Sequence, residues 1–370
     1  MTKLDTLYDD YGQSPWIDNI RRDWLNDGTL AGLVEQGVRG VTSNPSIFAK
    51  ALATSSAYDT YLVGATTQDP ERLFETLAVA DVRDACDVLA GVHEDSRREF
   101  REGVRRYCDG FVSLEVSPRL ARDTSATVAA AQRLSAEVDR ANLMIKIPAT
   151  REGLAAISEV LGEGINVNVT LIFSIDRYDE VLSAWMEGLE RAHANGHDVA
   201  SIASVASFFV SRVDAAVDAL LLDGDPRRGT TANAQVAKAY QLYRERIASE
   251  RANALLALGA QVQRPLWAST STKNPTYYDL LYVDNIVGDE TVNTMPDLTL
   301  AAVLDHGDFS ISLLADAQST ATAAAVLDGL GTDVSLDSVT ERLEDEGVAA
   351  FATAYDELLA TVASKIQPTH

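Results

Sequence analysis

The chain has 370 residues, of which 46% are hydrophobic and 23% charged, a size that suits one large α/β barrel or two average domains. Its 31 basic and 55 acidic side chains give a formal net charge of −24, which argues against nucleic acid and anionic membranes as partners. On such an acidic surface, an anionic substrate needs basic side chains gathered at its site.

Cysteine, histidine and hydrophobic patterns narrow the class further. Cys86 and Cys108 form no Cys-x-x-Cys unit, which fits a reducing compartment. His193 and His197 stand four residues apart, but the Asn-Gly pair between them breaks the helix that paired metal ligands need. The N-terminal residues lack a signal-peptide pattern, and no run reaches the roughly 18 apolar residues of a membrane span. We therefore expect a cytoplasmic protein with no metal site.

Short β-branched runs alternate with longer amphipathic stretches along the chain. Strands are predicted over residues 16–20, 37–43, 110–116, 143–148, 165–173, 201–210, 265–270 and 284–295. Helices are predicted most clearly over residues 70–92, 124–138, 174–194 and 230–258. Strands that alternate with helices indicate a parallel sheet, and eight such units favour an α/β fold of the closed (β/α)8 TIM-barrel type.

No linker or shift of composition divides the chain, so we expect a single barrel domain over residues 1–370. Residues 297–370 follow the last predicted strand and are mostly helical in pattern. One apolar stripe recurs there at helical spacing: Phe351, Tyr355, Leu358, Leu359 and Val362. We expect the final helix to pack onto the barrel, and a membrane-binding or partner-docking stripe is the alternative.

Lys146 lies among aliphatic residues in the predicted strand over residues 143–148. Side chains alternate along a strand, so Lys146 and Met144 share the face opposite to Leu143, Ile145 and Ile147. Burial disfavours a charged ammonium, and a neutral amine can attack a carbonyl group and form a Schiff base. A lysine that reaches the surface or pairs with a carboxylate is the alternative, and this segment alone leaves both open.

Polar side chains near the carboxyl ends of the first three strands are candidates for function, because TIM barrels place their sites there. Asp18 could be a general base or a solvated edge residue. Asn44 could hold a substrate hydroxyl, although Asn is also common in turns. Glu115 could pass protons through a water molecule or merely neutralise Lys146.

The fifth strand carries three polar side chains on one face: Asn166, Asn168 and Thr170. Buried polar groups need hydrogen-bond partners, and a polyol in the barrel lumen would supply them.

The sixth and seventh strands end near two cations. Arg212 begins a predicted helix, where backbone N–H groups and a guanidinium favour phosphate, and Lys273 could be a second phosphate cation. Ser207 and Ser269 are predicted hydroxyl donors beside them. Ordinary surface charges are the alternative, yet two cations at adjacent strand ends of so acidic a chain favour a binding role.

Five motifs, in this order along the chain, resemble those of transaldolases. They are Val41-Thr-Ser-Asn-Pro-Ser46, Ser113-Leu-Glu-Val116, Met144-Ile-Lys-Ile-Pro148, Ile165-Asn-Val-Asn-Val-Thr-Leu-Ile-Phe-Ser174 and Ala268-Ser-Thr-Ser-Thr-Lys-Asn274. The resemblance covers roughly residues 11–300 and is closest to the long bacterial subgroup of these class I Schiff-base enzymes, in which Ser-Asn-Pro-Ser replaces Thr-Asn-Pro-Ser.

The resemblance implies specific roles for these residues. Lys146 would form the Schiff base, and Asp18 would be the acid/base that acts on the substrate hydroxyl. The resemblance further implies that Glu115 and Thr170 hold the catalytic water. Asn44 and Asn168 would bind substrate hydroxyls, Ser207 would contact the substrate as well, and Arg212 would bind the phosphate. Lys273 departs from the family pattern, in which an arginine more often holds the phosphate; lysine keeps the charge but loses the bidentate fork.

The implied reaction transfers a dihydroxyacetone unit from sedoheptulose 7-phosphate or fructose 6-phosphate to glyceraldehyde 3-phosphate or erythrose 4-phosphate. It belongs to the non-oxidative pentose phosphate pathway and needs no cofactor. The first alternative is a fructose 6-phosphate aldolase, which releases free dihydroxyacetone and tends to carry Gln and Tyr where Glu115 and Phe209 stand. A catalytically inactive binding barrel is the second, and it predicts a substitution at Lys146, Asp18 or Glu115, which the chain lacks. Both a monomer and a homodimer remain open.

Overall fold

Eight parallel strands close into a barrel in sequence order, which confirms the predicted (β/α)8 architecture. The computed structural model describes residues 1–63, 67–314 and 317–366. The strands are β1 (Gln13–Ile17), β2 (Val41–Thr42), β3 (Val112–Glu115), β4 (Leu143–Pro148), β5 (Val167–Ile172), β6 (Ser204–Phe209), β7 (Arg264–Ala268) and β8 (Thr291–Met295).

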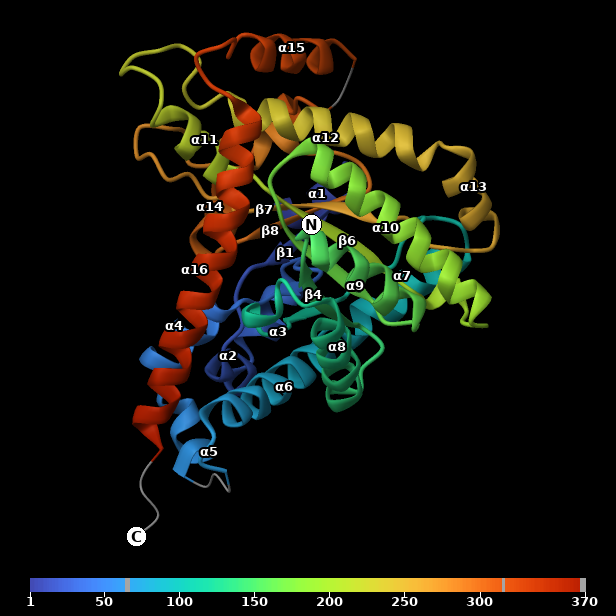
Figure 1. Cartoon of the computed structure of the whole chain (residues 1–370), viewed down its shortest axis with the longest axis vertical. Helices are drawn as coiled ribbons and strands as arrows, with labels where there is room; N and C mark the ends of the chain where they lie inside the picture. The colour runs from blue at the N-terminus through green and yellow to red at the C-terminus, as the bar shows by residue number, and fades with distance from the viewer. Residues whose placement is uncertain (64–66, 315–316, 367–370) are drawn as a thin grey trace.

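Helices surround this barrel and extend beyond it at the C-terminal end of the chain (Figure 1). They are α1 (Lys3–Asp9), α2 (Arg22–Asp27), α3 (Thr29–Glu35), α4 (Pro45–Thr54), α5 (Asp59–Val63), α6 (Pro70–Val88), α7 (Ala90–Arg101), α8 (Thr124–Val138), α9 (Arg151–Gly162), α10 (Ile175–Ala194), α11 (Ser211–Asp218), α12 (Thr231–Ile247), α13 (Glu250–Ala257), α14 (Asp297–His306), α15 (Ala317–Asp328) and α16 (Leu336–Lys365).

The predicted bounds of helices and strands are most accurate where a capping residue or a proline marks one end of the element, as at Asp123 and Pro148. The strand over 143–148 and the helix over 124–138 are confirmed to the residue. The first strand was placed three residues too late, because it begins at Gln13 and ends at Ile17. The last strand was too long, since residues 284–286 form a short 3-10 helix before β8 starts at Thr291.

Two long predicted helices are each divided in the structure. The pattern over 230–258 is interrupted after α12, and the Ser249 side chain caps α13 by accepting from the Ala252 N–H. The helix predicted over 70–92 is divided at Leu89, which lies between the end of α6 and the start of α7. α10 ends at Ala194, just before the Asn-Gly pair at which the sequence predicted a break, and Gly196 has a left-handed φ of +83°.

A buried charge cluster closes the amino ends of the strands. Arg264, at the start of β7, contacts Asp109 at 3.2 Å, and both side chains are almost fully buried. Asp109 also accepts hydrogen bonds from Ser14 and Trp16 of β1. Burial opposes ionisation, but Arg264 and Arg39 hold the pKa of Asp109 below its usual value. This end of the barrel is therefore filled by paired groups, and the cavity described below lies at the carboxyl ends.

The C-terminal helix α16 runs the length of one side of the molecule, from α11 past α4 to α5 (Figure 1). Its residues Phe351, Tyr355, Leu358 and Val362 are buried, and Leu359 is partly buried against the core. The apolar stripe therefore faces the body of the protein along several turns.

Candidate active site

A cavity of about 200 Å³ lies at the carboxyl ends of the strands. Seven of the ten predicted site residues line it: Asp18, Asn44, Lys146, Ser207, Arg212, Ser269 and Lys273. The other three, Glu115, Asn168 and Thr170, are not among its lining residues. They lie on β3 and β5, the two neighbours of β4: Glu115 and Asn168 are next to Lys146 in the strand register, and Thr170 is next to Pro148.

Lys146 stays inside the barrel, with only 5% of its surface exposed. Its Nζ donates to the Ser43 carbonyl oxygen at 3.2 Å and lies 3.8 Å from Oε2 of Glu115. The register pairs Glu115 with Lys146 and Lys146 with Asn168, so the three stand at one level of the barrel. The alternative in which Lys146 reaches the surface is therefore wrong. The distance between its Nζ and Glu115 is longer than a hydrogen bond. Glu115 is therefore not restricted to neutralising Lys146.

Glu115 and Thr170 present two buried polar atoms without a hydrogen-bond partner among the described residues. Oε2 of Glu115 and Oγ1 of Thr170 make no hydrogen bond to any described residue. Burial raises the pKa of Glu115 to about 7; the Lys146 ammonium opposes this shift, and Asp18 adds to it. Buried polar groups of this kind are normally satisfied by a ligand or an ordered water. A carboxyl with a pKa near 7 can both accept and donate a proton at neutral pH.

Asp18 follows directly after β1 and faces the cavity, rather than lying inside a strand as predicted. Its Oδ1 accepts a hydrogen bond of 2.6 Å from Oγ1 of Thr42, which lies 2.6 Å from Oγ1 of Thr294. Burial raises the pKa of Asp18, while Lys146 lowers it. The raised pKa brings this carboxyl closer to the range of a general acid/base.

Two threonines that were not among the predicted site residues orient Asp18. Because Thr42 uses its proton to reach Asp18, Thr294 must donate to Thr42, which gives a chain from β8 through β2 to the carboxylate. One signal was available, since Thr42 stands two residues before Asn44 and alternation puts both on one face. For Thr294 no such local signal exists.

Amide and hydroxyl groups prepare the cavity for a polyol. Oδ1 of Asn44 caps α4 by accepting from the Ile47 N–H at 3.1 Å, which leaves its Nδ2 to donate to a ligand. Ser207 donates to Oδ1 of Asn168 at 2.7 Å, and Asn168 in turn donates to Ser113 at 2.9 Å. Asn168 therefore orients the Ser207 hydroxyl without lining the cavity itself.

The polar face predicted for the fifth strand is divided between two places. Asn166 lies before β5 starts and donates to the carbonyl oxygens of Ala141 and Leu143 near the amino ends, away from Lys146. The strand is also irregular near its other end, because the register shifts between Val169 and Ile172 and Leu171 has a φ of +59°. Asn166 therefore does not join Asn168 and Thr170 near Lys146.

Arg212 and Lys273 form the cationic side of the cavity. The Arg212 guanidinium lies 5.5 Å from the centre of the Phe209 ring and makes no hydrogen bond within the described part of the chain. Burial lowers the pKa of Arg212. Burial also lowers the pKa of Lys273, and the positive charge of Arg212 adds to that shift. Two cations that repel each other are well suited to share an anion.

Two serine hydroxyl groups lie near these cations after β7, and one of them contacts Lys273. Lys273 donates to Oγ of Ser271 at 2.7 Å, and Oγ of Ser269 lies 3.0 Å from Oγ of Ser211 at the start of α11. Ser269 has a left-handed φ of +56°, which is costly for a non-glycine residue and often marks a functional site.

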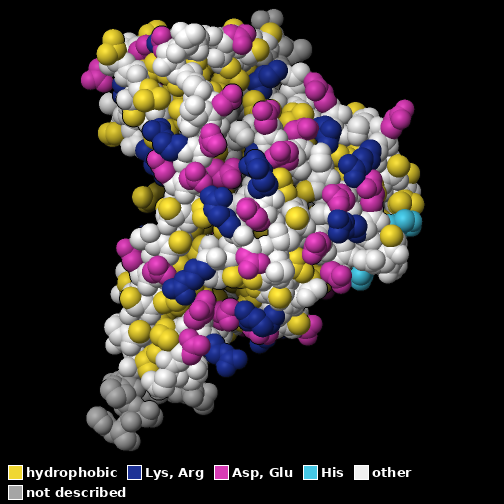
Figure 2. Space-filling model, viewed as in Figure 1, with side chains coloured by type: hydrophobic (Ala, Val, Ile, Leu, Met, Phe, Trp, Pro, Cys, Tyr) yellow, Lys and Arg dark blue, Asp and Glu magenta, His cyan; other side chains and the backbone are white. Residues whose placement is uncertain are grey.

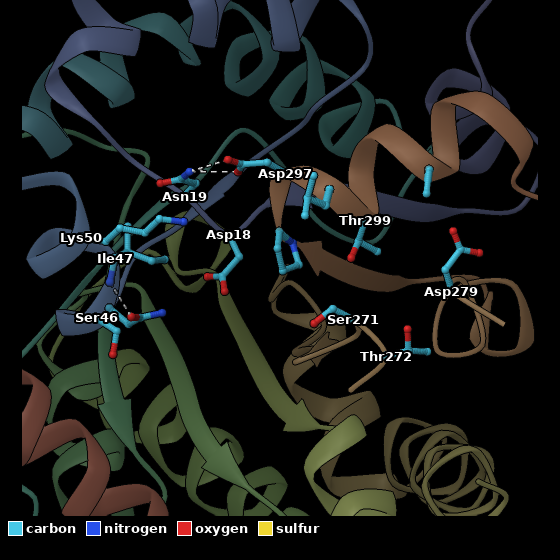
Figure 3. Close-up of a pocket in the computed structure, with 14 residues that line it drawn as sticks. Asp18, Asn19, Ser46, Ile47, Lys50, Ser271, Thr272, Asp279, Asp297 and Thr299 are labelled. Atoms are coloured by element: carbon cyan, nitrogen blue, oxygen red, sulfur yellow. Dashed lines mark hydrogen bonds between the residues drawn. The ribbon is translucent and has the colours of Figure 1, made fainter. Parts of the chain in front are cut away.

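A wider outer pocket of about 620 Å³ opens beside this cavity (Figure 3). The two share five lining residues: Asp18, Asn44, Ser46, Ser271 and Pro296. Figure 3 shows the Asp18 carboxylate near the centre of this pocket, with Lys50 across from it. Asn19 donates to Asp297 at 2.9 Å on the rim. Asp18 thus lines both the inner cavity and the wider outer pocket.

Comparison with known proteins identifies the family. A family model described as transaldolase/fructose-6-phosphate aldolase matches residues 15–362. The match therefore reaches beyond residue 300, where the resemblance in the sequence was expected to end, and takes in most of α16.

Curated relatives match almost the whole chain. A transaldolase of Saccharopolyspora erythraea is 47% identical over 96% of each chain. One from Thiobacillus denitrificans is 47% identical over 95% of this chain and 97% of its own, and transaldolase 2 of Nostoc punctiforme is 42% identical over 96% of each. The chain therefore belongs to the transaldolase/fructose-6-phosphate aldolase family.

Proposed function

We propose that this enzyme is a transaldolase that moves a dihydroxyacetone unit between sugar phosphates through a Schiff base on Lys146. The observation that carries the proposal is the buried amine 3.8 Å from a carboxyl whose pKa is about 7, beside a cavity that two cations, Arg212 and Lys273, also line. Full-length relatives named transaldolase support transfer over simple release.

The first half of the cycle forms the covalent bond. The unprotonated amine of Lys146 attacks the ketone carbon of the donor and gives a carbinolamine. Loss of water then requires a proton for the leaving hydroxyl, which Glu115 supplies through a water held between Glu115 and Thr170. The product is an iminium, whose positive charge withdraws electrons from the neighbouring C–C bond.

The second half breaks and remakes the C–C bond. Asp18 takes the proton from the donor hydroxyl next to the scissile bond, and an aldose phosphate leaves. The electron pair of the broken bond stays in the enamine on Lys146. A second aldose phosphate then receives that pair, and Asp18 returns the proton to the new hydroxyl. The iminium itself is the electron sink, so these steps call for no metal or organic cofactor.

Substrate binding follows from the remaining lining groups. Arg212 and Lys273 hold the phosphate with support from Ser269, while Asn44 and Ser207 contact hydroxyls of the carbon chain. The donors are sedoheptulose 7-phosphate and fructose 6-phosphate. The acceptors are erythrose 4-phosphate and glyceraldehyde 3-phosphate. All the groups named come from one chain, so both a monomer and a homodimer fit this scheme.

Two broader proposals accompany this function. We propose that residues 1–370 form one domain, with the helices after residue 297 packed onto the barrel, and that the enzyme works in the cytoplasm as part of the pentose phosphate pathway. Across residues 1–63, 67–314 and 317–366, no helix has the length and apolar character needed to cross a membrane.

Borohydride trapping tests the covalent step directly. The protein is incubated with fructose 6-phosphate and reduced, and the added mass is located by peptide mass spectrometry. A three-carbon adduct on Lys146 is expected, and Lys146→Ala should carry none. Lys238→Ala is the matched control, because Lys238 hydrogen-bonds Gln241 on α12 and does not line the cavity. An adduct on another lysine, or none in the wild type, contradicts the proposal.

A further inference from the structure

The long helix α16 contributes a side chain to the catalytic cavity. Phe351 lines that cavity together with Lys146, Asp18 and Arg212, although more than 200 residues separate it from Lys146 in the sequence. It is 6% exposed, so the ring is packed rather than free in solvent. None of the catalytic steps above uses this residue.

A glycine brings α16 close to the barrel at this point. A Cβ atom at Gly347 would lie 3.1 Å from the Leu171 side chain and 3.4 Å from the Phe173 ring. Residues four apart share one face of a helix, so Phe351 projects on the same side one turn later. Phe173 packs on Phe209, with ring centres 5.1 Å apart, and Phe209 also lines the cavity. Aromatic rings from β6 and α16 therefore both line the cavity, and Phe173 packs beside the first of them.

Charged contacts hold α16 against the loops that follow β3 and β5. Arg122, after β3, contacts Asp345 at 2.6 Å, and Arg177, in the first turn of α10, contacts Glu344 at 3.3 Å. Further along the helix, Arg119 contacts Asp356 at 2.7 Å. Basic and acidic side chains are accordingly mixed over this face of the molecule rather than gathered by sign (Figure 2). The helix is thus tied to the strand ends that carry Glu115 and Thr170.

This placement matters because the enamine on Lys146 has two fates. If its carbon takes a proton from solvent, the resulting iminium adds water at C2, the C–N bond breaks, and free dihydroxyacetone leaves with the amine regenerated. The net reaction is then cleavage of fructose 6-phosphate to glyceraldehyde 3-phosphate and dihydroxyacetone. A transferase must keep bulk water from the enamine until an acceptor aldose arrives.

We propose that Phe351 is the residue of α16 that shields the enamine from water and so sets the ratio of transfer to release. This inference rests on the Schiff-base role of Lys146 proposed above. The water proposed between Glu115 and Thr170 is compatible with it, because neither of these two residues lines the cavity that Phe351 lines.

The test measures both fates from one donor. Phe351→Ala is given fructose 6-phosphate without acceptor, and free dihydroxyacetone is assayed; with erythrose 4-phosphate added, sedoheptulose 7-phosphate is assayed. We expect the ratio of release to transfer to rise about tenfold over the wild type, a modest change in the relative height of two barriers. Phe351→Leu, which keeps an apolar side chain of similar reach, should restore most of the wild-type ratio.

A second variant separates shielding from mere packing. Leu358 is fully buried on the same helix but does not line the cavity, so Leu358→Ala should lower the melting temperature without changing the ratio. If Phe351→Ala leaves the ratio unchanged, or if Leu358→Ala raises it equally, the shielding role is wrong. Borohydride trapping on each variant keeps the two proposals apart: an adduct on Lys146 with an unchanged ratio overturns only this inference.

Discussion

The two sides of the catalytic site differ in the solvent exposure of their side chains. On the side of β3, β4 and β5, the Lys146 and Glu115 side chains are each 6% exposed, and Thr170 is fully buried. On the side of β6 and β7, Arg212 is partly exposed and Lys273 is exposed. Bond-making groups thus lie where the dielectric is low, and anion-binding groups lie where a charged ligand can enter and leave.

Because of this contrast, burial favours the function of the carboxyl on one side and opposes that of the cations on the other. Burial moves Glu115 to a pKa of about 7, at which a carboxyl can shuttle protons. Partial desolvation of the charged groups also lowers the pKa of Arg212 and of Lys273, but there the charge must survive to hold phosphate. The more open position of these cations limits the cost of keeping that charge. We therefore expect variants on the dry side to change kcat and variants on the open side to change KM.

The largest effect is expected at Lys146. Lys146→Ala should lower kcat by about 10⁴-fold or more, because the nucleophile itself is removed. The variant should still fold, since loss of the ammonium removes the group that lowers the pKa of Glu115, and that carboxyl then stays protonated and neutral at pH 7. Steady-state rates and circular dichroism check both statements. Retention of more than a small residual rate would place the nucleophile elsewhere.

Glu115→Gln should have the second largest effect. We expect kcat to fall by about 10² to 10³-fold, because an amide cannot transfer the proton and such groups typically contribute that much to the rate. The limb of the pH–rate profile near pH 7 should disappear with it.

The stability of Glu115→Gln gives an independent check on the same pKa. Because the pKa of Glu115 is raised from 4.5 to about 7 in the fold, the native state holds its proton more tightly than the unfolded chain. The wild type should therefore lose stability relative to Glu115→Gln as the pH rises from about 4.5 through about 7. Urea melts at several pH values measure this difference, and parallel curves would contradict it.

On the open side, Arg212→Ala should raise KM for fructose 6-phosphate by about 10- to 100-fold, because a charge-assisted contact is lost. The effect should vanish with unphosphorylated fructose as donor, since the missing partner is then absent from both proteins. An equal loss with both sugars would mean that Arg212 serves the fold or the chemistry rather than the phosphate.

The smallest effect is expected at Lys273, whose side chain is exposed. Lys273→Ala should raise KM only about two- to fivefold, and added salt should reduce the difference, as for other solvent-screened charges. Lys273→Arg should lower KM below that of the wild type, because a guanidinium can bind phosphate through two hydrogen bonds. If Lys273→Ala matched Arg212→Ala in size, the contrast between a main and an auxiliary cation would fail.

The sequence by itself determined the barrel, the face of β4 that carries Lys146, and the chemical character of most lining residues. Alternation along a strand and polar groups at strand ends are local features, so Lys146, Asn44 and Arg212 could be placed from them. The resemblance to transaldolases then assigned them roles.

The tertiary structure alone decided which of these groups meet and what encloses them. Barrel closure joins β8 to β1 and β2, so Thr294 reaches Asp18 through Thr42, and no local pattern encodes that contact. Asn166 lies just before the amino end of β5, where its amide meets the carbonyl oxygens of Ala141 and Leu143 instead of the cavity at the carboxyl end. Phe351 reaches the cavity from α16, which packs closely on Leu171 and Phe173 one turn earlier, at Gly347. Such contacts depend on the packing of distant segments, which periodicity along the chain does not report.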